Sequence, residues 1–205
     1  MKLTELTIKT MKYFIFLFLL TASTCQEKKQ PVSNEELSNI LSNGIFKYHE
    51  TKDHQYLDSA YIKLTQNKDY KNSELATANL QLSISLLLNM KKYDELEKML
   101  NKTKNLNEYN RLNTLNIVRY LKLKNVNKQK ANSYIEENIA RITDSLNTKP
   151  KDSLIYADYF SMRMFLVGKE KAIMEIDSMQ TDKVYSEDFY ELLKESIKVY
   201  PDEHL

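Results

Sequence analysis

Apolar residues recur at every third or fourth position along most of the chain, which predicts a series of amphipathic helices. Ser33 precedes the first helix and Glu36 follows three residues later, the pattern of a helix-capping box. The predicted apolar face of the last helix is Phe189, Leu192, Leu193, Ile197 and Tyr200. The spacing places the helices at about 34–50, 53–65, 75–90, 93–103, 108–123, 128–146, 153–167, 169–179 and 186–200.

The segment 75–90 is apolar nearly all the way round, which is typical of a buried helix. Between Leu80 and Leu86 apolar and polar residues also alternate, which fits a strand. A helix is favoured because the chain contains no second strand-like run that could pair with it. We therefore expect a helix here, at the centre of the folded domain.

Turns are scarce, because the 205 residues include only two glycines and three prolines. A β-sandwich or a doubly wound α/β fold needs many Gly- and Pro-rich turns. Turns near Lys52, Lys91, Asn125 and Gly168 divide the helices into four antiparallel hairpins plus a C-terminal helix. This spacing is typical of helical-hairpin repeats. The predicted fold is all-α, an α-solenoid of stacked antiparallel hairpins, with a compact, non-repetitive helical bundle as the alternative.

Three of the predicted hairpins share a local pattern in their second helices. In each, a residue at one site is followed four positions later by a large aliphatic residue, and the pairs are Leu96 with Leu100, Ala131 with Ile135, and Ala172 with Ile176. Together with Tyr93, this pattern resembles a degenerate tetratricopeptide-type repeat. The resemblance implies that a small residue at this site lets the two helices of a hairpin pack closely.

The segment 11–25 has the three parts of a secretory signal. Lysines precede an apolar run at 13–20, small residues follow at 21–24, and the chain's only cysteine, Cys25, comes next. The apolar run is too short for a transmembrane helix, which needs about 20 such residues. Because 11–25 alone contains all three parts, both Met1 and Met11 fit as the start of the protein.

A cysteine directly after small residues resembles the signal of a bacterial lipoprotein. The resemblance implies that Cys25 is acylated and becomes the first residue of the mature, exported chain. An ordinary secretory signal cut nearby is the alternative. The expected organisation is a signal with its lipidation cysteine at 1–25, a polar tether at 26–33 and a helical-repeat domain at 34–205. In lipoproteins an aspartate directly after the cysteine often signals retention in the inner membrane, so the resemblance implies that Gln26 favours the outer membrane of a bacterial envelope where the cell has one.

Charge argues against a nucleic-acid partner. The chain has 30 basic and 28 acidic residues, and residues 1–25 contain three lysines and one glutamate. The rest of the chain is therefore formally neutral, whereas nucleic-acid binding normally requires a basic excess. The sequence does not indicate an oligomeric state.

The sequence shows no catalytic or cofactor-binding motif. His49 and His54 are five residues apart, whereas a zinc-protease helix needs two histidines four apart on one face. Gly44 and Gly168 stand alone, while phosphate loops and nucleophile elbows need several glycines in a short span. We therefore expect no metal site, no cofactor and no enzyme activity. A small helical enzyme whose site is invisible in the sequence stays open as an alternative.

All four arginines lie in the predicted third and fourth hairpins. Arginine makes planar, bidentate contacts that lysine cannot make, and arginines with aromatic residues are typical of binding hot spots. The candidate partner-binding residues are Arg111, Arg119, Tyr120, Tyr156 and Arg163. We expect them to line a groove that holds an acidic or C-terminal segment of another envelope protein. Surface ion pairing together with core aromatics is the alternative.

The predicted function is that of a membrane-anchored envelope lipoprotein that acts as a protein-binding adaptor or scaffold through its helical repeats. Repeat stacks present extended binding surfaces, and the resemblance to tetratricopeptide-like lipoproteins implies a role in envelope assembly. An immunity or inhibitor protein that neutralises one toxin is a second interpretation, and a passive envelope spacer is a third.

Overall fold

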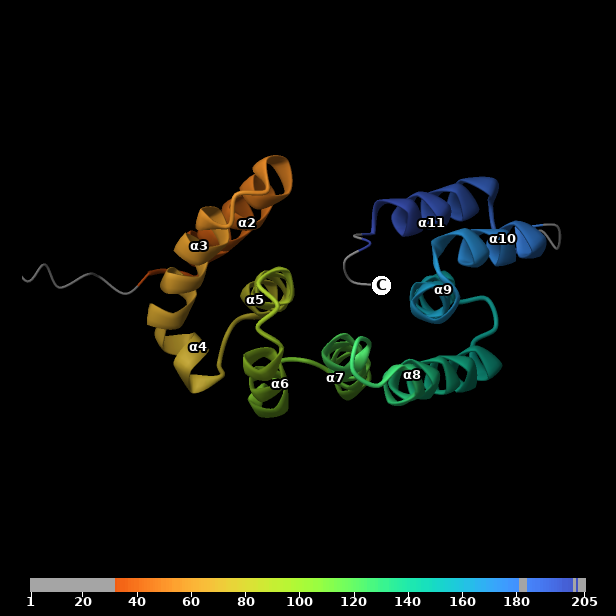
Figure 1. The fold of residues 1–205 in the computed structure, drawn as a ribbon, viewed down its shortest axis with the longest axis horizontal. Helices are drawn as coiled ribbons and strands as arrows, with labels where there is room; N and C mark the ends of the chain where they lie inside the picture. The colour runs from red at the N-terminus through yellow and green to blue at the C-terminus, as the bar shows by residue number, and fades with distance from the viewer. Residues whose placement is uncertain (1–31, 181–183, 201, 203–205) are drawn as a thin grey trace, which may run out of the picture. The chain divides into compact units, whose positions relative to one another are not determined.

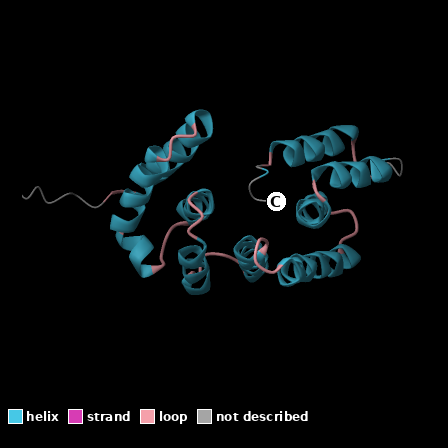
Figure 2. Cartoon of the chain, viewed as in Figure 1, coloured by secondary structure: helices cyan, strands magenta, loops and turns pink. Residues whose placement is uncertain are grey.

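The computed structural model describes residues 32–180, 184–200 and 202. Ser33–Leu205 forms a compact unit by itself. Cys25, the signal segment and the tether as far as residue 31 lie outside the described residues, so their predicted roles stay predictions. The described part of the chain contains helices and no strand, which confirms the all-α class (Figure 2).

Ten helices follow one another through the described residues (Figure 1). All nine segments predicted from the sequence match an observed helix within two residues at each end. The helix α4 was not predicted, and α5 is a helix throughout the segment that also fitted a strand. The helices are α2 (Asn34–Thr51), α3 (Gln55–Gln66), α4 (Lys68–Asn72), α5 (Thr77–Asn89), α6 (Tyr93–Lys102), α7 (Glu108–Leu123), α8 (Lys128–Thr148), α9 (Ser153–Val167), α10 (Lys169–Gln180) and α11 (Glu187–Val199).

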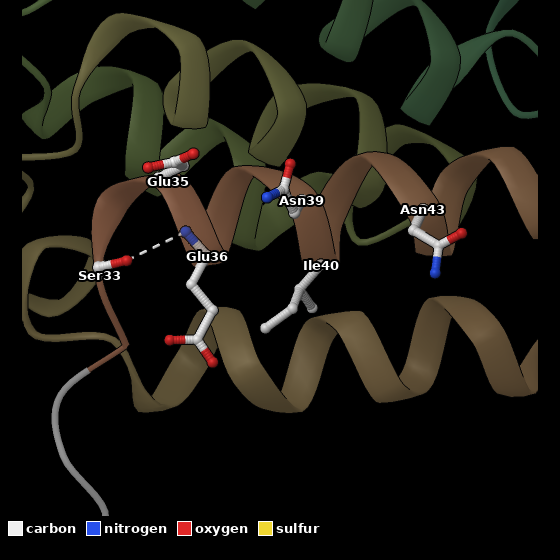
Figure 3. A pocket seen from close by; sticks show the side chains of 6 residues that line it. All are labelled: Ser33, Glu35, Glu36, Asn39, Ile40 and Asn43. Atoms are coloured by element: carbon white, nitrogen blue, oxygen red, sulfur yellow. Dashed lines mark hydrogen bonds between the residues drawn. The ribbon is translucent and has the colours of Figure 1, made fainter.

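Short polar side chains cap the starts of several helices. The hydroxyl of Ser33 accepts a hydrogen bond of 3.1 Å from the backbone N–H of Glu36, which Figure 3 shows as a dashed line. Asn107 and Ser186 cap α7 and α11 in the same way, and Asp152 caps α9. A cap satisfies a backbone donor that has no partner inside the helix. The starts of these capped helices are therefore set by local sequence.

The hairpins predicted from the sequence are present as packed pairs. The helix α2 packs against α3, α5 against α6, α7 against α8, and α9 against α10. Three of the connecting turns contain a residue with positive φ, namely Lys52, Lys91 and Gly168. Gly168 takes this conformation without a steric penalty, because it has no Cβ atom. Successive hairpins also touch, through the pairs α2–α5, α6–α7 and α8–α9.

Small residues bring two helices of the first hairpin close together. Gly44 is buried on α2 and faces α3. A Cβ atom built on Gly44 would lie 2.8 Å from the Cβ of Ala60 and 3.0 Å from the backbone oxygen of Tyr56. In the third and fourth hairpins, the alanines Ala131 and Ala172 are fully buried. Burial of a small residue at these sites is what close helix packing requires.

One hydrophobic core cluster extends over α7 to α11. It includes Phe160 at the centre of α9, which is the largest side chain among the fully buried residues. The face of α11 that enters this core differs from the predicted one, because Leu192 is 71% exposed and Tyr190 is buried instead. The buried members of the cluster are Tyr120, Leu121, Ala131, Ile135, Ile142, Phe160, Met162, Met164, Phe165, Ala172, Ile176, Tyr190, Leu193 and Ile197.

Among the residues that the structure describes, no helix combines the length and the apolar character needed to cross a membrane.

Candidate functional site

The three arginines predicted to bind a partner each face a carboxylate of the same chain. Arg119 donates from Nε to Glu97 Oε1 over 3.0 Å, which links α7 to α6. Arg163 makes a bidentate pair with Glu175 on α10, with N···O distances of 3.0 and 2.5 Å. For Arg111 the nearest pair is with Glu108, 3.9 Å away on the same helix. These contacts partly neutralise the charge that the acidic-partner hypothesis required.

The two predicted tyrosines have different surroundings. Tyr120 is 5% exposed; its ring packs edge-on against Phe165, and its hydroxyl donates to the Phe165 carbonyl over 3.2 Å. Tyr156 is half-buried on α9, and its ring lies edge-on to that of Tyr185, with the centroids 5.1 Å apart. The structure thus places Tyr120 in the core and Tyr156 close to the surface.

The two histidines weighed as metal ligands in the sequence, His49 and His54, both lie beside the ring of Tyr48. The centroids of His49 and His54 are 5.4 and 5.0 Å from that of Tyr48, at the turn between α2 and α3. Within the described ranges, no three His, Cys, Asp or Glu side chains gather into a group able to hold a metal ion.

A buried polar network joins α7 to α8. Its centre is Asn138, which is completely buried. The Oδ1 atom of Asn138 accepts hydrogen bonds from Asn116 Nδ2, at 3.0 Å, and from Arg141 Nη2, at 2.7 Å. Its Nδ2 atom donates to the backbone carbonyl of Asn113 over 2.9 Å. Arg141 also approaches the Asn113 side-chain oxygen, at 3.4 Å, so its guanidinium is directed into the network.

Next to this network lies a cleft of about 470 Å³, which we call the α7–α9 cleft. Three helices and the linker before α9 contribute to it, and its rim includes the exposed residues Lys149 and Leu154. Tyr109 and Ile155 supply partly buried apolar surface, and Asp152 and Asp158 supply carboxylates. The described residues that line the cleft are Tyr109, Ser145, Thr148, Lys149, Asp152, Leu154, Ile155 and Asp158.

The electrostatics of the α7–α9 cleft centre on Asp158. Burial raises the pKa of the Asp158 carboxyl, and the nearby charge of Asp152 raises it further. A hydrogen bond from Tyr109 Oη to Asp158 Oδ2, 3.2 Å long, opposes this rise without cancelling it. A half-buried carboxylate with a raised pKa in a cleft is a recognised indication of a functional site.

Two other partly buried carboxylates, Glu97 and Glu175, are stabilised by basic side chains, whereas Glu95 accepts hydrogen bonds from the hydroxyls of Tyr61 and Tyr70. Burial alone would raise the pKa of Glu97, but hydrogen bonds from Lys122 and Arg119 outweigh it and hold the pKa below its usual range. The hydrogen bond from Arg163 likewise lowers the pKa of Glu175. No lysine or arginine of the described residues forms an ion pair with Asp152 or Asp158. The α7–α9 cleft therefore contains two carboxylates without an ion-pair partner among the described residues, although Asp152 accepts hydrogen bonds from the backbone N–H groups of Leu154 and Ile155.

The Arg163–Glu175 pair allows a test of the electrostatics by pH. Replacing Glu175 with glutamine is expected to lower the free energy of unfolding by about 0.5–1 kcal/mol at pH 7, the range of a partly exposed ion pair. Because the folded-state pKa of Glu175 is lowered, this contribution is complete above the unfolded-state pKa, about 4.3. It is lost as the pH falls through the folded-state value.

Urea unfolding of the wild type and the variant between pH 3 and pH 7 measures this difference. Glu136→Gln, at an exposed position of α8, is the control and should change little at any pH. A Glu175→Gln loss that stays constant down to pH 3 would show that the pair does not act through the carboxylate charge.

A hollow of similar volume, about 460 Å³, lies along α2 (Figure 3). The described residues that line it are Ser33 and five residues of α2 itself, namely Glu35, Glu36, Asn39, Ile40 and Asn43. A hollow along one helix surrounds a ligand on fewer sides than the α7–α9 cleft does. We therefore take the α7–α9 cleft as the candidate site.

Comparison of the chain with protein-family models, with curated proteins and with solved structures gives no match. The described structure therefore defines the class by itself: an all-α protein of packed helical hairpins with a cleft between its third and fourth hairpins.

The sequence contained one signal for this region that the predictions did not use. Asn138 lies three residues after Ile135 and four before Ile142, so it occupies the apolar face of its helix. A polar residue at a core-facing position is informative, because it must find hydrogen-bond partners there. Asp152 and Asp158 had no comparable signal, since their distance in sequence gives no indication of a shared cleft with Tyr109.

Proposed function

We propose that this protein is a bacterial envelope lipoprotein, anchored through Cys25, that acts as a protein-binding adaptor or scaffold. In this proposal the α7–α9 cleft accepts a segment of another envelope protein, and the hairpins stack as an α-solenoid. Arg111, Arg119 and Tyr156 lie on the same two first helices, α7 and α9, and would contribute to the edges of the binding surface.

The observation that carries the proposal is the composition of the α7–α9 cleft. Its volume of about 470 Å³ lies within the range of about 300–1,000 Å³ typical of ligand pockets. Leu154, on the rim, is 77% exposed. A large aliphatic side chain beside an aromatic residue and carboxylates resembles the core-and-rim composition of protein interfaces. The signal-like segment 11–25 supports the envelope as the place where this binding occurs.

Site-specific photocrosslinking in the native cell tests the proposal. A photoreactive phenylalanine analogue replaces Leu154 in the full chain, and crosslinked products are identified by mass spectrometry. We expect one envelope protein to be captured from position 154. The matched control places the same analogue at Ile62, which is 52% exposed on α3, away from the candidate cleft.

The products also separate the proposed function from its alternatives. A single envelope protein captured from position 154 and not from position 62 supports an adaptor. Capture of a single toxin in a tight one-to-one complex would instead establish the immunity or inhibitor function. The same products from both positions, or none from position 154, would overturn binding through this cleft.

A further inference from the structure

Resting on the proposed function, we infer that the α7–α9 cleft selects a basic side chain of its partner, a lysine or an arginine. The cation would lie between Asp152 and Asp158, and its aliphatic stem would lie along Tyr109 and Ile155. The inference names the chemical class of the partner segment, which the sequence alone had suggested to be acidic.

The first argument is charge complementarity. Two carboxylates in one cleft repel each other, and partial burial adds to the cost of keeping both ionised. The raised pKa of Asp158 reflects both effects, with burial as the larger. A ligand cation placed between the two carboxylates would relieve the repulsion, and a hydrogen bond to a carboxylate in such a setting is stronger than a neutral one.

The second argument is that no basic side chain of the described residues forms an ion pair with Asp152 or Asp158. Arg141, the nearest guanidinium on α8, is bound to Asn138 and Asn113 and acts on Tyr109 rather than on Asp158. Lys149, on the rim, is exposed and makes no ion pair with the carboxylates among the described residues. The arginines that would have attracted an acidic partner are themselves paired, as Arg119 is with Glu97.

The third argument is the shape and polarity of the lining. A lysine or arginine side chain has a long apolar stem and a charged end, so it suits a site with apolar walls and carboxylates. Tyr109 offers both an aromatic ring, which attracts cations, and a hydroxyl already bound to Asp158. An acidic or purely aliphatic side chain would leave the carboxylates unbalanced.

The test measures binding of a minimal probe to the full chain in detergent micelles by NMR. The probe is Nα-acetyl-lysinamide, and the readout is the backbone amide shifts of Leu154, Ile155 and Asp158. We expect saturable shifts with the lysine probe. Nα-acetyl-norleucinamide, which has a similar aliphatic stem without the charge, should bind at least about ten-fold more weakly, as expected for loss of a charge-assisted hydrogen bond.

Two variants remove one charge each and keep the local structure. Asp158→Asn keeps an oxygen that can accept the Tyr109 hydrogen bond, and Asp152→Asn keeps a good N-cap for α9. Each should lower the affinity for the lysine probe about ten-fold. Asp144→Asn, at an exposed site on α8 outside the cleft lining, is the control and should bind as the wild type does.

The pH dependence gives an independent readout. Probe binding needs ionised Asp158, whose pKa is raised mainly by burial. On acidification, binding should therefore be lost at a higher pH than in a site whose aspartate has the ordinary pKa of about 3.9. For the same reason Asp158→Asn should unfold at a higher temperature than the wild type at pH 7 and lose this advantage at pH 3, because the unfavourable charge is absent there.

The outcomes separate the inference from the proposed function. Equal binding of the lysine and norleucine probes, or full affinity in Asp158→Asn, would overturn the inference. If crosslinking from position 154 nonetheless captures an envelope protein, the adaptor function stands without the basic-residue selectivity. Selective binding of the lysine probe without any crosslinked protein would support the inference and count against the adaptor.

Discussion

Replacing Asn138 with alanine is expected to lower the free energy of unfolding by about 3 kcal/mol, one of the two largest effects expected for this chain. Asn138 is completely buried and makes three hydrogen bonds: two join it to Asn116 and Asn113 on α7, and the third comes from Arg141 on its own helix α8. Alanine removes all three and leaves a small cavity. The Asn116 amide keeps its second acceptor, Glu137, at 3.2 Å, whereas Arg141 loses its shortest hydrogen bond.

Urea unfolding followed by circular dichroism measures the effect. A loss of this size in a domain of this length corresponds to a fall in Tm on the order of 10 °C. Asn147→Ala, at an exposed position of the same helix, is the matched control and should stay within about 0.5 kcal/mol of the wild type. A loss below about 1 kcal/mol in Asn138→Ala would mean that the network contributes little to stability.

Replacing Gly44 with alanine is expected to destabilise the fold by about 2 kcal/mol, in spite of alanine's higher helix propensity. Propensity alone favours alanine over glycine inside a helix by about 1 kcal/mol. The added Cβ would lie 2.8 Å from Ala60 Cβ and 3.0 Å from the backbone oxygen of Tyr56. Backbone atoms cannot give way as a flexible side chain can, so α2 and α3 would have to separate, and overpacking of this kind costs about 1–3 kcal/mol.

A double variant tests the cause. Adding Ala60→Gly to Gly44→Ala removes the closer of the two contacts. The free energy of unfolding of the double variant should therefore be higher than the value obtained by adding the effects of the two single changes. Asn43→Ala, at the exposed neighbouring position on α2, is the control for helix propensity alone. If Gly44→Ala proves more stable than the wild type, propensity decides at this site and the close helix contact is absent.

Much of the fold follows from local sequence. The boundaries of α7 and α9 agree with the spacing of apolar residues and with the caps Asn107 and Asp152. Such signals act within a few residues, so a single sequence carries them completely. The short helix α4 escaped prediction because five residues contain too little periodicity to separate a helix from a turn.

The candidate site depended on contacts between distant residues. The sequence indicated that arginines and tyrosines in the third and fourth hairpins could bind another protein. It did not indicate which residues of the same chain each of them would contact. Tyr120 meets Phe165 across 45 residues, and Tyr109 meets Asp158 across 49. Spacing along a helix cannot predict such pairs, because they depend on how α7 and α9 are both packed against α8.

The sequence by itself determined the all-α class, the helix boundaries and the hairpin turns, since helix periodicity and capping are local properties. The tertiary structure alone decided where charge is balanced and where it is not. Folding places Arg163 against Glu175 and encloses Asn138 in a satisfied network, while it leaves Asp152 and Asp158 together in a cleft without a basic partner among the described residues. Electrostatic balance depends on distances through space, and only the packing of helices fixes those distances.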